Sequence, residues 1–183
     1  MQLQGKKIFL RSVQPSDADI LYKWENDKSY WQVSGTKKSF TKKEIQDFIS
    51  NQKDIYLDKQ LRLMICTSPL NPLSRWRGEK GTGVVRGEVV GCIDLFNFNE
   101  PNLTAGIGIL IDKKYRKKGY ASDALSLLIK YSFEILNLNQ LHCNISEENK
   151  ASIKLFQKHK FKIIEKKNGL HSLQLNSSLR GAK

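Results

Sequence analysis

The sequence predicts an α/β (α+β) fold, in which one mixed sheet carries helices on both of its faces. Three observations support this prediction. Strand and helix patterns follow one another in the order β-α-α-β-β-β-α-β-α-β-β. A chain of 183 residues, 39% of them hydrophobic, is long enough to bury one core as a single domain. The third observation is a strand, a basic turn and a long amphipathic helix that run through residues 105–134.

Seven segments have the alternating or continuous apolar pattern of strands. They are residues 7–11, 61–66, 88–96, 106–111, 140–145, 161–164 and 170–175. Residues 97–103 are predicted to form the turn between the third and fourth strands. Asn168 and Gly169 lie between the last two strands, and this dipeptide is typical of a tight hairpin.

Four segments have helical periodicity or helix-capping signals. One helix starts at Pro15, and Thr41 and Glu44 form a capping box that opens a second helix. The third helix starts near Gly119 and is the longest. The fourth follows a cap at residues 148–150. Helices therefore separate the predicted strands in the way that a layered α/β domain requires.

The turn between the fourth strand and the long helix is the most informative stretch of the chain. It carries five cationic side chains: Lys113, Lys114, Arg116, Lys117 and Lys118. The helix begins directly behind them, where free N–H groups and the positive end of the helix dipole favour anions. A basic turn that leads into a helix N-terminus predicts a diphosphate site. The alternative is an ordinary turn with a solvated basic face.

Charge and composition exclude several classes of protein. Lys and Arg number 31 against 18 Asp and Glu, and the net charge of +13 favours acidic partners such as nucleic acid, ribosomes or a polyphosphorylated cofactor. No nucleic-acid-binding motif accompanies this charge, so specific nucleic-acid recognition is not predicted. The three cysteines and three histidines lack metal-ligand spacing, so we predict no metal site and expect buried free thiols in a cytoplasmic protein. The sequence predicts neither a membrane span nor a signal peptide.

Two motifs resemble those of a known superfamily. Residues 116–121 (RKKGYA) match the R/Q-x-x-G-x-G/A loop of the Gcn5-related N-acetyltransferases (GNAT), and residues 149–158 (NKASIKLFQK) resemble the N-x-x-S-x-x-L/F-Y-x-K segment of that family. Within it, the chain most resembles the ribosomal-protein alanine N-acetyltransferases and the spermidine N-acetyltransferases, over residues 88–161. The resemblance implies acetyl transfer from acetyl-CoA to an amine. It also implies a mostly antiparallel sheet that is splayed between its fourth and fifth strands.

The resemblance further implies which residues hold acetyl-CoA. The backbone amides of the basic loop would bind the pyrophosphate, and main chain of the fourth strand would pair with the pantetheine arm. Asn149 would contact the arm from the opposite side. The implied cofactor-binding residues are Ile109, Leu110, Ile111, Arg116, Lys117, Lys118, Gly119, Tyr120, Ala121, Asn149 and Phe156.

The chain departs from the family where protons are transferred. Many relatives carry a tyrosine as the general acid at the position of Phe156, and a phenyl ring cannot donate a proton. Ser152 is the nearest hydroxyl and the candidate acid, unless it only hydrogen-bonds at its helix N-terminus. Relatives often carry a glutamate at the position of Gly106. Asp94 on the neighbouring strand is the candidate base, unless it is only an outward-facing carboxylate. Lys160 stands where relatives have a glycine.

The missing glutamate bears on the choice of acceptor. An α-amino group has a pKa of about 7.7–8.0 and a lysine side chain one of about 10.4, so an α-amino group needs less help from a base. We therefore expect a protein or peptide N-terminus as acceptor, with a polyamine or other small-molecule amine as the alternative. Association with ribosomes is a further hypothesis, and the chain is expected to be a monomer or a homodimer. For Trp24 and Trp31 two roles are expected as alternatives: they pack in the core, or they line the acceptor pocket.

Residues 67–87 interrupt the pattern between the second and third strands. This stretch holds Pro69 and Pro72 together with several glycines and cationic residues. Long irregular loops in compact domains are usually functional or mobile. We expect a basic, flexible insertion within a single domain spanning residues 1–183, which either covers the acceptor site or has no role there.

Two rival functions stay open on the sequence alone. The vacant tyrosine and glutamate positions agree with a non-catalytic module that binds acetyl-CoA as a sensor. Net charge alone supports a nucleic-acid-associated protein, which would bind with a steep salt dependence.

Overall fold

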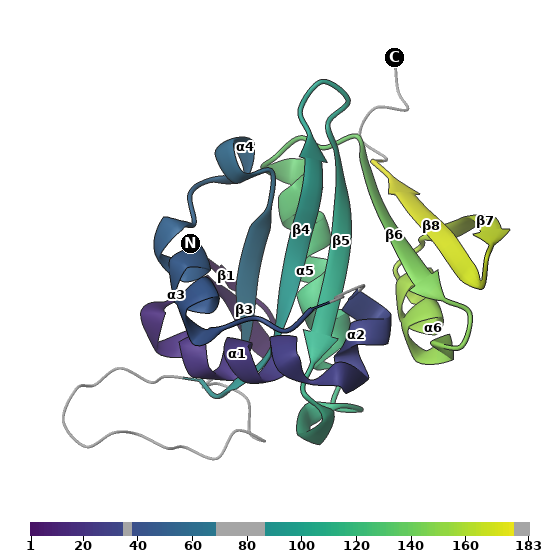
Figure 1. Ribbon diagram of the computed structural model, residues 1–183. Helices are drawn as coiled ribbons and strands as arrows, with labels where there is room; N and C mark the ends of the chain where they lie inside the picture. Colours follow the sequence, from purple (N-terminus) through teal and green to yellow (C-terminus); the bar gives the residue numbers. More distant parts are fainter. Residues whose placement is uncertain (35–37, 69–86, 178–183) are drawn as a thin grey trace.

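In the computed structural model, residues 1–34, 38–68 and 87–177 are described (Figure 1). Within these ranges, eight strands form one sheet in the order β1-β2-β3-β4-β5-β6-β8-β7. Among these eight described strands, β5 and β6 pair in parallel and the other neighbouring pairs are antiparallel. The predicted mixed, mostly antiparallel sheet is confirmed. The strands are β1 (Gln2–Gln4), β2 (Ile8–Ser12), β3 (Leu61–Thr67), β4 (Val89–Asn99), β5 (Thr104–Ile111), β6 (Gln140–Ser146), β7 (Lys162–Lys167) and β8 (Leu170–Asn176).

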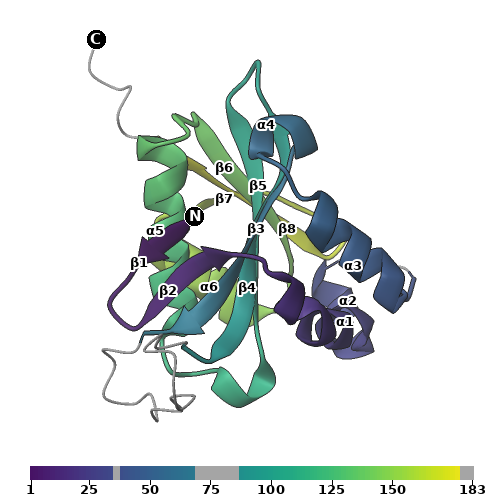
Figure 2. The ribbon, with the colours of Figure 1, turned by 90° about the vertical axis from the view of Figure 1, so that its left-hand side faces the viewer.

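Helices cover both faces of the sheet, as predicted (Figure 2). One face carries α5 and α6, and the other carries α1, α2 and α3, as the edge-on view shows. The helices are α1 (Ala18–Asn26), α2 (Lys28–Ser34), α3 (Lys42–Asn51), α4 (Ile55–Asp58), α5 (Tyr120–Glu134) and α6 (Lys150–Lys158), with 3-10 turns η1 (Pro15–Asp17) and η2 (Lys113–Tyr115).

Alternation along the strands sorts the core into two layers. On β2, Ile8 and Leu10 pack in the layer that contains α5, whereas Phe9 between them packs in the layer that contains α1 and α3. Successive side chains of a strand point to opposite faces, so one apolar run supplies both layers. Each layer is filled from its helix side by buried residues at helical spacing: Ala124, Leu125 and Leu128 of α5, and Leu21 and Trp24 of α1.

The sheet opens between β5 and β6. These strands pair only at Thr104, Ala105 and Gly106 of β5, and Figure 1 shows them diverging from there on. Burial follows the same boundary, because residues 105–107 are buried and residues 108–111 are half-buried. The predicted splay between the fourth and fifth strands is confirmed; with β1 counted, these are strands five and six.

Several boundaries differ from the prediction. The short strand β1 was not predicted, because three residues with one apolar side chain give no alternating pattern. Helices α2 and α4 were also not predicted, and each is shorter than the two turns that a periodicity needs to show. The turn expected at residues 97–103 is shorter, since β4 continues to Asn99 past an irregularity in which Asn97 has a φ of +51°.

The local signals are otherwise confirmed. Thr41 and Glu44 exchange the two hydrogen bonds of a capping box at α3. Asn168 and Gly169 have φ values of +52° and +72°, as the tight turn between β7 and β8 requires. The three cysteines are buried free thiols. Of the insertion at 67–87, residues 69–86 lie outside the described residues.

Within the described ranges, no helix has the length and apolar character that crossing a bilayer needs. In the same ranges, no three His, Cys, Asp or Glu side chains gather as they would around a metal ion.

Lys160, in the turn after α6, adopts the backbone conformation that glycine favours. Its φ is +67°, in the left-handed region, where a side chain costs an L-residue about 1–2 kcal/mol. We expect Lys160→Gly to raise the free energy of unfolding by about 0.5–1 kcal/mol, measured by urea denaturation. Lys166→Gly, within β7, is the matched control and should lower it by a similar amount. A fall in stability with Lys160→Gly would contradict this account of the turn.

Candidate functional site

The candidate site begins with the unpaired edges between β5 and β6. Residues 107–111 of β5 have partners on β4 but none on β6, while residues 143–146 of β6 pair only with β8. Polar main-chain groups that face this opening need partners from water or from a bound molecule. The structure therefore places Ile109, Leu110 and Ile111 on the free edge of β5, where an extended polar chain can pair with them.

The basic loop lies at the end of this opening. β5 ends at Ile111, and residues 112–119 lead to α5, which begins at Tyr120. Arg116, Lys117, Lys118 and Gly119 are exposed, whereas Tyr120 is buried and anchors the helix. The exposed cations and the first N–H groups of a 15-residue helix thus lie together at one surface.

Gly119 gives this loop its shape. It is the N-cap residue of α5 and has a φ of +83°. Lys117 also has a positive φ, of +62°. The ammonium of Lys7, on the turn before β2, donates a hydrogen bond to the carbonyl of Lys118 at 3.1 Å. A side chain at Gly119 would have its Cβ 3.1 Å from the same Nζ. Lys7 therefore adds a sixth cation to the loop.

The loop is also tied to the helices of the opposite sheet face. Trp24 Nε1 donates to Asp112 Oδ2 at 3.0 Å, and Lys113 pairs with Asp27 at 3.3 Å. Burial raises the pKa of Asp112, but the hydrogen bonds from Trp24 and from the Lys114 N–H outweigh it, and the pKa lies below its ordinary value. The Tyr30 ring lies beneath Lys113. Arg116, at 5.7 Å from the Tyr30 ring centre, forms a second cation–π contact. Helices α1 and α2 therefore support the loop.

Across the opening, α6 presents two of the predicted residues. Asn149 is its N-cap, and its Oδ1 accepts a hydrogen bond from the Ser152 N–H at 3.1 Å. Both side chains are half-buried. The hydroxyl of Ser152 has no hydrogen-bond partner among the described residues, so the oxygen is available to a ligand. Phe156 lies elsewhere: it is 3% exposed in the core and packs edge-on against Phe161.

Asp94 lies on the face that α1 and α3 cover, directly across β4–β5 pairing from Gly108. Both of its oxygens accept hydrogen bonds from Arg62, at 2.8 and 3.1 Å. Arg62 also binds Glu25 of α1 at 2.6 Å and stacks over the Phe48 ring. Burial lowers the pKa of Arg62, but the two carboxylates outweigh that effect and leave it well above the ordinary value. The candidate base is thus held in a bidentate ion pair.

The position expected to carry a glutamate in relatives is closed in this chain. Gly106 is buried, and a Cβ there would lie 2.3 Å from the Phe96 ring. The same ring meets His142 edge-on. Burial lowers the pKa of His142, so the imidazole is neutral at physiological pH. Phe96 therefore occupies the space that a longer side chain at Gly106 would need.

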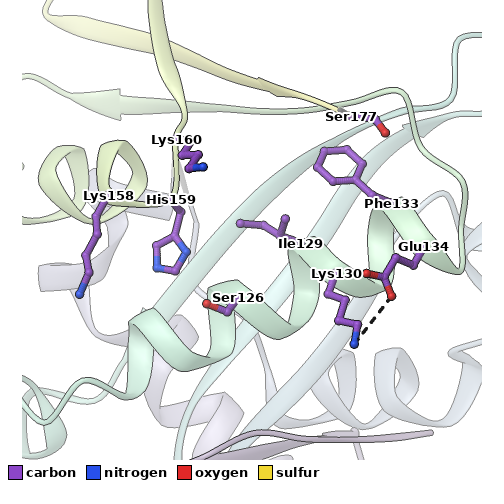
Figure 3. A pocket seen from close by; sticks show the side chains of 9 residues that line it. All are labelled: Ser126, Ile129, Lys130, Phe133, Glu134, Lys158, His159, Lys160 and Ser177. Atoms are coloured by element: carbon purple, nitrogen blue, oxygen red, sulfur yellow. Dashed lines mark ion pairs between the residues drawn. The ribbon is translucent and has the colours of Figure 1, made fainter. Parts of the chain in front are cut away.

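A separate groove of about 500 Å³ runs along α5 (Figure 3). It is lined by Ser126, Ile129, Lys130, Phe133, Glu134, Lys158, His159, Lys160 and Ser177. Lys130 pairs with Glu134 inside α5 at 3.8 Å, and His159 Nε2 lies 2.9 Å from Ser122 Oγ. None of the residues predicted for the cofactor or for catalysis lines this groove.

Comparison with known proteins identifies the family. A family model described as an acetyltransferase (GNAT) domain matches residues 7–162. The chain belongs to the GNAT acetyltransferases. The expected membership and the expected acetyltransferase activity class are therefore confirmed.

Relatives and solved structures agree with this membership. The uncharacterized N-acetyltransferase p20 of Bacillus licheniformis is 26% identical over 160 residues, 87% of this chain and 81% of that protein. The spermidine N(1)-acetyltransferase of Escherichia coli K12 is 30% identical over 96 residues, 52% of this chain and 50% of that protein. A structure of the Vibrio cholerae spermidine N-acetyltransferase in complex with CoA and spermine superposes with a TM-score of 0.76, at 16% identity over 94% of this chain and 96% of that chain. At that identity the likeness shows the fold alone.

Sequence reasoning missed Lys7, Glu25 and Arg62 in the neighbourhood of this GNAT site. No local pattern marks Lys7 or Glu25, because each reaches its partner across strands or from a helix far away in sequence. Arg62 has a visible signal, since a cation on an otherwise apolar strand (LRLMICT) predicts a buried partner.

Gly119→Glu tests the loop. The new carboxylate would stand at the positive helix terminus, in the space that an anion needs, so we expect the affinity for acetyl-CoA to fall by about tenfold or more in calorimetric titration. Gly169→Glu is the matched control, since Gly169 also has a positive φ but lies in the β7–β8 turn. Unchanged acetyl-CoA affinity in a folded Gly119→Glu protein would remove the loop from the site.

Proposed function

We propose that this GNAT protein transfers the acetyl group of acetyl-CoA to a primary amine by direct attack. The observation that carries the proposal is the opening between β5 and β6, which ends at the exposed cationic loop before α5. The loop suits a diphosphate and the free edge of β5 suits an amide-containing arm. Both features lie on one continuous stretch of chain, residues 107–121.

The residues present fit this cosubstrate. Arg116, Lys117, Lys118 and Lys7 supply cations, and the main chain of Gly119, Tyr120 and Ala121 supplies N–H groups for the pyrophosphate. Ile109, Leu110 and Ile111 would pair with the pantetheine arm, with Asn149 on the other side of the opening. Phe156 would support this side only indirectly, as the core residue on which α6 rests. When bound, acetyl-CoA supplies an activated acyl carbon and a thiolate leaving group.

Two proton transfers accompany the reaction. The attacking amine must lose a proton, and the thiolate gains one. Ser152 is the proposed acid, because its hydroxyl has no partner among the described residues and lies in the first turn of α6, beside the opening. Asp94 is the proposed base, acting through water, since Arg62 occupies both of its oxygens.

Different observations favour different acceptors. The pKa of an α-amino group, which needs little help from a base, favours a protein or peptide N-terminus. A polyamine is supported by the relatives named above, of which one is called a spermidine N(1)-acetyltransferase and another is solved with spermine. An acetyl-CoA sensor that transfers nothing is the remaining candidate, favoured by the phenyl ring of Phe156 and by the closed space at Gly106. Ribosome association, cytoplasmic location and a monomeric or homodimeric state stay predictions.

An amine panel tests the transfer. We expect purified protein with acetyl-CoA to release free coenzyme A thiol when spermidine, a monoamine or a short peptide with a free N-terminus is added. Thiol release without an amine is the background control. Tight acetyl-CoA binding with no amine-dependent release across the panel would favour the sensor and contradict the transferase.

Ser152→Ala tests the proposed acid. Loss of a positioned proton donor typically lowers the rate by about 100-fold, so we expect kcat to fall by that order while the affinity for acetyl-CoA stays the same. The fold should survive, because the cap bond uses the backbone N–H of residue 152 and not its hydroxyl. A kcat within about threefold of the original would leave Ser152 as a helix-terminus residue only.

A further inference from the structure

The described ion pairs include one in which Arg62 joins two carboxylates. Arg62 binds Asp94 through two hydrogen bonds and Glu25 through one. All three side chains are only 20–24% exposed. Two carboxylates and one guanidinium leave a net charge of −1, in a chain whose overall charge is +13. In a half-buried setting, such a charge attracts a cation more strongly than an exposed carboxylate does.

Within this cluster, the carboxylate oxygen that has no partner among the described residues is on Glu25. Asp94 has both oxygens engaged by Arg62, whereas Glu25 uses only Oε1. Among the described residues, Oε2 of Glu25 forms no hydrogen bond or ion pair. The backbone of Glu25 is fixed as well, because its carbonyl accepts a hydrogen bond from Trp31 Nε1 at 2.7 Å. The free oxygen is therefore held in place by contacts to both its side chain and its main chain.

The cluster of Arg62, Asp94 and Glu25 lies at the level of the sheet where the opening between β5 and β6 begins. Arg62 on β3 pairs with Asp94 on β4, and Asp94 pairs with Gly108 on β5. Gly108 is where β5 becomes half-buried as β6 departs. It has no side chain, and among the described residues a Cβ there would meet Phe96 alone, at 3.5 Å. On this face of the sheet, no β5 side chain at the register of Asp94 separates the cluster from the opening.

We propose that Glu25 binds a positively charged nitrogen of the acceptor. Arg62, itself held by Asp94, fixes the position of the Glu25 carboxylate. The inference rests on the acetyl transfer proposed above and names its acceptor class. The acceptor is an amine with a second cationic nitrogen, since the reacting nitrogen must lose its charge before it attacks. Asp94 then anchors Arg62 through both of its oxygens, in addition to the water-mediated role as base proposed above.

The test compares spermidine with butylamine, which keeps no charge once its one nitrogen is deprotonated. We expect Glu25→Gln to raise KM for spermidine about tenfold or more, with kcat within about threefold and KM for butylamine within about twofold. The variant leaves Arg62 paired with Asp94, so no buried charge is left alone. Glu25→Asp, which keeps the charge but shortens the side chain, should raise KM for spermidine by less. Glu100→Gln is the matched control, because Glu100 is an exposed carboxylate paired with Lys59, and it should change neither KM.

Each outcome decides between the two proposals. Turnover with an unchanged spermidine KM in Glu25→Gln, or with equal rises for both amines, overturns the role of Glu25 and leaves the transferase intact. Turnover by the unaltered protein on peptide N-termini and butylamine but not on spermidine also overturns it. Absence of thiol release with every amine, despite acetyl-CoA binding, overturns the transferase and the role of Glu25 together.

Discussion

The site depends on the short length of the β5–β6 pairing. These strands are joined at three residue pairs, whereas β6 and β8 pair along seven. β6 is therefore committed to the C-terminal hairpin, and the two strands part where β5 still has five residues to run. Unpaired main chain inside a sheet is costly unless something polar fills the gap. The fold thus keeps a polar slot between apolar strands, and the loop and α6 acquire their roles by lying at its sides.

The basic loop and the cluster around Arg62 are not independent. Asp112 and Lys113 at the end of β5 bind Trp24 and Asp27, so the basic loop is braced by the end of α1. One residue after Trp24, Glu25 reaches down to Arg62 and β3. The same helix end therefore contacts the loop proposed for the pyrophosphate and the cluster proposed for the acceptor. A shift of α1 would alter both binding steps together.

The sequence predicted the features that local chemistry determines. Gly119 and the five cations of the loop could be recognised because a helix N-terminus imposes a pattern on consecutive residues. Asn149 and the capping box at Thr41 were visible for the same reason. The family resemblance supplied the splay, which no periodicity reveals. By contrast, the pairing of Arg62 with Asp94 and Glu25 joins residues 32 and 37 positions apart, and only the assembled sheet brings them together.

Two further features of the site are steric. Phe156, which the family resemblance places beside the cofactor, is buried with its ring edge-on against Phe161. Gly106 stands where relatives often carry a glutamate, and the Phe96 ring fills the space that a side chain there would need. Which ring packs beside Phe156 or Gly106 depends on the assembled fold, so a single sequence does not show it.

The burial of the three thiols has a consequence for the chemistry of the protein in solution. Burial raises the pKa of Cys66 to about 11 and of Cys143 to about 12, and it raises the pKa of Cys92 further. A thiol with a pKa of 11 is ionised in only about one molecule in a thousand at pH 8, and the thiolate is the reactive form. The folded chain should therefore react little with disulfide reagents and alkylating agents. In an assay of released coenzyme A thiol, the protein's own cysteines should then add almost no signal.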